Sequence, residues 1–108
     1  MAKPYQPRRA SFRWLEDAPE YVLDCFDHGS KHVDRWEVWF GGSLLEPVLQ
    51  AERKVYFLCM SDHPSHPQGY SQWGEVRADI RPSHRRIRWL DLPEHIRLHV
   101  AMRVAQTN

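Results

Sequence analysis

Apolar positions run together, or alternate with polar ones, in four separate stretches of the chain. The segment YVLDCFD (21–27) is rich in β-branched and aromatic residues, and a Gly-containing turn separates it from VDRWEVWF (33–40). This pattern predicts a β-hairpin. VYFLCMS (55–61) is apolar on both faces, which is typical of a strand covered on both sides. RRIRWLDL (85–92) predicts a short final strand.

Side chains of the second predicted strand divide between two faces. Trp36, Val38 and Phe40 share one face, because successive residues of a strand point in opposite directions. Trp39 lies on the other face, which is half polar. The stretch 41–54 opens with paired glycines and contains a proline, so we expect a loop with at most one helical turn.

The C-terminal stretch predicts the longest helix, over residues 92–105. A capping-box pattern marks its start, with Asp91 as the N-cap. At 100° per residue its apolar side chains cover a wide arc, while His95, His99 and Arg103 share the remaining face. The apolar arc predicts that the helix packs on the sheet.

Together these elements predict an α+β fold, in which a small, mainly antiparallel sheet of about four strands carries the C-terminal helix on one face. A chain of 108 residues has room for one domain. Residues 1–13 contain several arginines and prolines and predict a flexible basic arm, and residues 14–108 form the predicted domain. The sequence lacks a membrane-length apolar run and the apolar core of a secretory signal, so we expect a cytoplasmic protein.

The net charge of +1 conceals an uneven distribution along the chain. The first thirteen residues carry four cations and no acid, residues 14–76 are acidic, and residues 77–108 are basic again. Such asymmetry indicates a charged partner surface. Its sign stays open at this point, because folding can interleave the three blocks.

Arginine and tryptophan gather late in the chain, where Trp73 and Trp89 flank an arginine-rich segment, 77–88. Cationic and aromatic side chains are what backbone neutralisation and base stacking require, so nucleic-acid binding by this segment and the basic arm is one hypothesis. The same residue types are enriched at protein interfaces, so a protein partner is another. The sequence contains no helix-turn-helix, zinc-finger or RNP pattern.

Enzymatic chemistry has weaker support in the sequence. A metal-dependent hydrolase that uses His63, His66 and Glu75 is the weakest hypothesis, because histidine spacing alone does not aim imidazoles at one point. No residue sits in a nucleophile-elbow pattern. Cys25 and Cys59 are the only cysteines, and we expect free buried thiols. We therefore predict no catalytic residue, metal or cofactor.

Three segments in order, DHGSKHVDRWEVWF, YFLCMSDHPSHPQGYSQWGE and RIRWLDLPEHIRLHV, resemble a group of small uncharacterised proteins from phages, plasmids and related mobile elements. The resemblance covers roughly residues 24–100. The positions that fall on the family pattern are Asp27, Gly29, Asp34, Arg35, Met60, Ser61, Pro67, Gln68, Gly69, Gln72, Gly74, Glu75, Asp91, Leu92 and Pro93. The sequence departs from it at His28, where the family tends to have Asn, and at Trp73, which replaces a polar residue. The resemblance implies an origin and no established activity.

The shared polar positions predict a structural motif, in which Arg35 pairs with Asp34 or Glu75 and Gly69 provides a positive φ angle. The residues of this motif are Asp27, Gly29, Asp34, Arg35, Gln68, Gly69 and Glu75. By analogy with its implied origin, we expect a non-enzymatic protein that binds a host or phage macromolecule, such as an inhibitor of a host defence complex of the CRISPR type. The expected contact residues are Trp39, Trp73, Arg77, Arg85, Arg86, His63 and His66. The loop 62–72 is either part of that surface or only scaffold.

Overall fold

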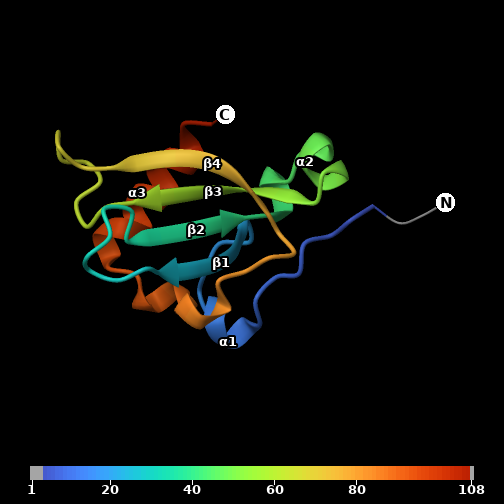
Figure 1. Cartoon of the computed structure of the whole chain (residues 1–108), viewed down its shortest axis with the longest axis horizontal. Helices are drawn as coiled ribbons and strands as arrows, with labels where there is room; N and C mark the ends of the chain where they lie inside the picture. The colour runs from blue at the N-terminus through green and yellow to red at the C-terminus, as the bar shows by residue number, and fades with distance from the viewer. Residues whose placement is uncertain (1–3, 108) are drawn as a thin grey trace.

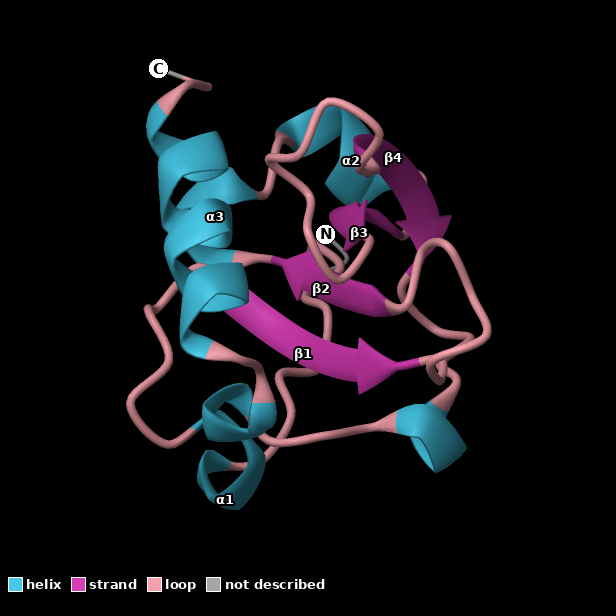
Figure 2. Cartoon of the chain, turned by 90° about the vertical axis from the view of Figure 1, so that its left-hand side faces the viewer, coloured by secondary structure: helices cyan, strands magenta, loops and turns pink. Residues whose placement is uncertain are grey.

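The computed structural model describes residues 4–107 and has a mixed α+β fold (Figure 1). Four strands form one antiparallel sheet in the order β1-β2-β3-β4. Their bounds are Val22–Asp27, Trp36–Phe40, Lys54–Met60 and Ser71–Arg77. The longest helix is α3 (Glu94–Ala105), which packs across one face of the sheet, as predicted (Figure 2).

Shorter helical segments connect and flank the strands. Helix α1 (Phe12–Leu15) precedes β1, and α2 (Pro47–Ala51) precedes β3. The stretch 41–54 contains two helical segments, α2 and a 3-10 turn, where the sequence predicts at most one helical turn. Three 3-10 turns complete the helical elements, at Gly42–Leu44, Ser83–Arg85 and Trp89–Asp91. No helix in residues 4–107 is long and apolar enough to cross a membrane.

The alternation of strand side chains divides the core between the two faces of the sheet. On the α3 side, Trp36, Val38 and Phe40 pack with residues of α3 such as Ile96. On the opposite side, Trp39 packs with a smaller cluster that shares no residue with the first. Both predicted faces of β2 are confirmed, and the half-polar face is the one that buries Trp39.

The predicted final strand, 85–92, is wrong, and the fourth strand is β4. Within 85–92 only Arg86 forms a β-bridge, to Phe26 of β1. The chain then turns because the Asp91 carboxylate accepts a hydrogen bond from the backbone N–H of Arg88 at 2.9 Å. Asp91 thus caps a 3-10 turn rather than α3, whose N-cap position is Pro93.

The two edges of the sheet differ. Ala10 donates its backbone N–H to Leu23 of β1, and Ile87 donates to Cys25, so the outer edge of β1 is covered. The chain just before α1 therefore lies against the domain, and Figure 1 shows it arriving there from the N-terminal side at the right. Residues 1–3 of the predicted arm lie outside the described residues. The outer edge of β4 has no strand partner in residues 4–107.

Candidate functional site: an arginine cleft

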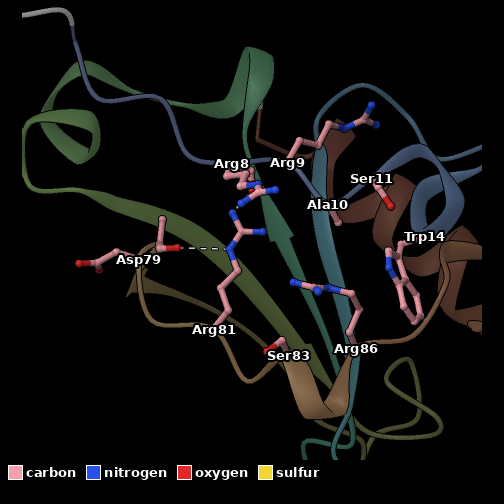
Figure 3. A pocket seen from close by; sticks show the side chains of 10 residues that line it. Arg8, Arg9, Ala10, Ser11, Trp14, Asp79, Arg81, Ser83 and Arg86 are labelled. Carbon is pink, nitrogen blue, oxygen red and sulfur yellow. Dashed lines mark hydrogen bonds between the residues drawn. The ribbon is translucent and has the colours of Figure 1, made fainter.

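A polar cleft of about 650 Å³ lies where the segment before α1 meets the segment after β4. Four arginines line it, two from each segment, and Trp14 closes one end (Figure 3). We call this the arginine cleft, and its four arginines are Arg8, Arg9, Arg81 and Arg86. Ala10, Ser11, Ala78, Asp79 and Ser83 complete the lining.

A buried carboxylate anchors two of these arginines. Asp24 is 0 % exposed, and it accepts hydrogen bonds from Arg86 Nη2 at 2.8 Å and from Arg81 Nη1 at 3.0 Å. A register irregularity between Val22 and Asp24 places Asp24 opposite Trp39, on the face away from α3. The bond to Asp24 also raises the pKa of Arg86. One carboxylate therefore holds two guanidinium groups and leaves the group of three with a net positive charge.

Backbone carbonyls accept further hydrogen bonds from two arginines of the cleft and fix their positions. Arg9 donates from Nε to the Val22 carbonyl at 3.0 Å, and Arg81 donates to the carbonyl of Arg8. The side chain of Arg8 is exposed and forms no hydrogen bond or ion pair within residues 4–107. Arg8 is therefore the arginine of the cleft whose charge and donors are free to meet a ligand.

Trp14 brings an aromatic surface to the same place. Its ring is half-buried, packs against the α3-side core, and lines the cleft. The guanidinium carbons of Arg13 and Arg86 lie 5.4 and 6.0 Å from the ring centroid, within the range of cation–π interactions. An aromatic ring in a cleft lined by guanidinium groups suits a ligand that carries both negative charge and a flat ring.

The predicted contact residues are spread over the molecule. Trp39 is 1 % exposed, so the prediction that it contacts a partner is wrong: its ring is packed edge-on against Phe26, 5.2 Å between centroids. Arg86 lines the cleft, whereas Arg85 is exposed and donates to the His28 carbonyl after β1. Arg77 is exposed and pairs with Asp79 at 2.7 Å.

The remaining predicted contacts lie on or near the α3 side of the sheet. Trp73 is half-buried against Phe40. His63 and His66 are exposed in the loop between β3 and β4. The ring of His63 stacks on that of His95, with centroids 5.6 Å apart. Residues 4–107 contain no group of three or more His, Cys, Asp or Glu side chains placed to hold a metal ion.

The loop between β3 and β4 is tied to α3 at two points. The imidazole of His99 lies 2.7 Å from Ser71 Oγ and 3.3 Å from Ser65 Oγ, and His95 Nε2 lies 2.6 Å from the Asp62 carbonyl oxygen. His99 is only 7 % exposed, so its predicted place on a solvated helix face is wrong. Burial, and then the charge of Arg103, lower the pKa of His99 and favour the neutral ring.

Two predictions for the structural polar motif need correction. Arg35 pairs with Asp27 at 2.9 Å and with Asp62 at 3.4 Å, not with Asp34 or Glu75, which are both exposed. The hydrogen bond that Arg35 donates to Asp27 lowers the pKa of Asp27.

Both glycines of the motif occupy positions where a side chain would be strained or would collide with the backbone. Gly69 does not have a positive φ angle; it is required because a Cβ there would collide with the carbonyl oxygen of His63. The positive angle belongs to Gly29, at φ +98°, whose N–H donates to Asp27. Gln68 is exposed, and its backbone N–H donates to His66 Nδ1 at 3.0 Å.

The sequence predicts that the basic arm and the arginine segment act together in nucleic-acid binding, but it does not predict their direct contact, the role of Asp24 or the place of Trp14 in the cleft. One signal in the sequence points to Asp24: it is the only charged residue in the otherwise apolar run 21–26. Cys25 and Cys59 are free and buried, as predicted.

No protein-family model, curated protein or solved structure matches the chain. The resemblance to small mobile-element proteins therefore stays a prediction.

Proposed function

We propose that the protein is a non-enzymatic macromolecule-binding protein, and that its arginine cleft binds single-stranded nucleic acid. The observation that carries this proposal is the convergence of Arg8 and Arg9 with Arg81 and Arg86 beside Trp14. Phosphate groups meet the guanidinium groups, and a base stacks on the Trp14 ring, which is the combination that binds single strands without sequence preference.

The distribution of charge supports an anionic ligand, and the Trp14 ring in the lining favours one that carries bases. The cleft is walled by guanidinium groups that hold fixed positions, because Asp24 and backbone carbonyls orient three of them. Guanidinium groups bind phosphate oxygens in a bidentate manner, and a rigid fork loses little entropy when it does so. The acid at the rim, Asp79, is paired with Arg77 outside the cleft, and this bond lowers the pKa of Asp79.

Binding of a fluorescein-labelled single strand of about a dozen nucleotides, followed by anisotropy between about 50 and 200 mM NaCl, tests the proposal. We expect affinity to fall steeply with salt, and a duplex of the same sequence to bind more weakly, since its bases cannot reach Trp14. Arg8→Gln removes a cation that holds no part of the fold, so it should reduce the slope of log K against log salt by about 0.7, the value for one phosphate contact with a single strand.

Lys31→Gln is the matched control, because Lys31 is exposed in the turn between β1 and β2, away from the cleft. It should leave the slope unchanged. Equal slopes for Arg8→Gln and Lys31→Gln would mean that nucleic acid does not bind in the arginine cleft. A protein partner, such as a defence complex, stays a prediction; its signature is a partner captured from host lysate that survives nuclease treatment.

A further inference from the structure

A second pocket lies on the α3 side of the sheet, near the C-terminal end of the helix. Its volume is about 330 Å³, and it is lined by Glu46 and Ser43 with the aromatic side chains Tyr56 and Trp73. Leu44 and Thr107 complete its wall. We call it the aromatic pocket. Its volume is at the small end of the range for ligand sites in proteins.

Negative charge gathers around this pocket. Glu46 lines it, and Glu46 forms no ion pair among residues 4–107. Ser43 donates from Oγ to the Glu20 carboxylate at 2.6 Å. Glu75 is paired with Tyr56 across β3 and β4, so both side chains lie on the same face. Burial, followed by contact with Glu46 and by the charge of Glu75, raises the pKa of Tyr56.

The aromatic rings are arranged to offer both a face and an edge. Tyr56 and Trp73 meet at an interplanar angle of 75°, with centroids 6.4 Å apart. Trp73 already interacts with one cation, because the guanidinium carbon of Arg103 lies 5.9 Å from its ring centroid. Arg103 does not line the pocket, and Lys54, the next cation on this side, is paired with Glu52 at 3.0 Å.

We propose that the aromatic pocket binds a small organic cation of the alkylammonium class. Aromatic faces attract a cation through the quadrupole of the ring, and a nearby carboxylate adds direct attraction. Recognition of quaternary and methylated ammonium groups in proteins relies on this combination. The proposal concerns a different face of the sheet from the arginine cleft, and it does not depend on nucleic-acid binding.

Choline chloride is the probe, and 3,3-dimethyl-1-butanol is its neutral isostere. Both are titrated into the whole protein while the indole N–H signal of Trp73 is followed by NMR, with sodium chloride added to match ionic strength. Trp73→Phe assigns the signal. We expect choline to shift it saturably and to bind at least about fivefold more tightly than the neutral isostere, as a cation–π contribution of this kind predicts.

Glu46→Gln should weaken choline binding by roughly fivefold, because it removes the charge and keeps the shape. Glu52→Gln is the matched control: it makes the same change of charge at the other end of α2, outside the pocket, and should alter binding by less than about twofold. Equal binding of choline and its neutral isostere overturns the proposal, and so does the absence of a saturable shift. Because these two outcomes are measured on the unmodified protein, they do not depend on how the variants fold.

Discussion

The arginine cleft and the aromatic pocket lie on opposite sides of one four-stranded sheet, and they hold their charges differently. In the cleft, Arg81 and Arg86 are bound to the buried Asp24, so most of their donors serve the fold. In the aromatic pocket, the Glu46 carboxylate forms no ion pair within the described residues.

This difference separates residues that maintain the structure from residues that meet a ligand. A side chain with many internal partners is a poor test of function, because its removal changes the fold first. Arg8 and Glu46 have few internal partners, so the effect of replacing either one on binding can be interpreted directly. Substitutions can be ranked by how strongly they separate these two kinds of residue.

The largest effect is expected from Asp24→Asn. The substitution keeps the shape of the side chain but leaves Arg81 and Arg86 without the carboxylate that neutralises them. Breaking a buried ion pair in this way costs about 3–5 kcal/mol. Urea unfolding followed by circular dichroism measures the cost. A loss below about 1 kcal/mol would mean that the two arginines are solvated without Asp24.

A smaller loss of stability is expected from His99→Gln, in the helix α3 on the same side of the sheet as the aromatic pocket. The substitution disturbs the contacts with Ser65 and Ser71 and should cost about 1–2 kcal/mol at neutral pH. Chemical unfolding at a series of pH values provides the measurement.

The same substitution has a signature in pH. The folded pKa of His99 lies below its ordinary value of 6.5, so the unfolded chain binds the proton more readily. The stability contributed by His99 is therefore complete above 6.5 and is lost as the pH falls through that value toward the folded pKa. His99→Gln should flatten the slope of unfolding free energy between about pH 5 and 7. An unchanged slope would assign that dependence to other groups.

Asp27→Asn should lower the free energy of unfolding by about 1 kcal/mol, because a partly exposed ion pair contributes less than a buried pair and more than an exposed one. Asp27 pairs with Arg35 as Asp24 pairs with its arginines, but both side chains are partly exposed. Its pKa is lowered, so the stabilisation is present above the ordinary value of 3.8 and disappears as the pH falls through the lower folded pKa. Acid unfolding should begin at a higher pH in the variant. A cost equal to that of Asp24→Asn would remove burial as the explanation of their difference.

The smallest effects are expected from Arg8→Gln and Glu46→Gln. Both side chains are exposed, and neither forms an ion pair within residues 4–107, so each substitution should change the unfolding free energy by less than about 0.5 kcal/mol. Thermal unfolding of the two variants beside the unmodified protein checks this. A larger loss in either variant would place that residue among those that maintain the fold.

Much of the fold follows from local pattern, and the exceptions have physical reasons. β1, β2 and β3 are apolar on both faces or alternate clearly, so their sequences predict strands. β4 escapes prediction because SQWGEVR is polar, contains glycine and lies at an edge. Conversely, the alternation of RIRW resembles a strand, but the Arg88 backbone N–H donates to the Asp91 carboxylate, and the chain turns there into a 3-10 helix.

The candidate sites depend on contacts that no local pattern contains. Arg8 and Arg81 are separated by 73 positions, and only the course of the chain along β1 brings them together. Likewise, helical periodicity alone predicts a solvated face for His99, whereas Ser71 on β4 supplies the partner that makes its burial possible. Sequence reasoning could therefore name the charged segments but not the cleft that they build.

The uncovered outer edge of β4 has a consequence for self-association. An unpaired strand edge can recruit another chain through its backbone N–H and C=O groups. Ala10, Arg86 and Ile87 already pair with the opposite edge of this sheet, so no further strand can pair there. Two copies joined through β4 would present covered edges on both outer sides. Growth by strand addition would then end at a closed two-fold pair.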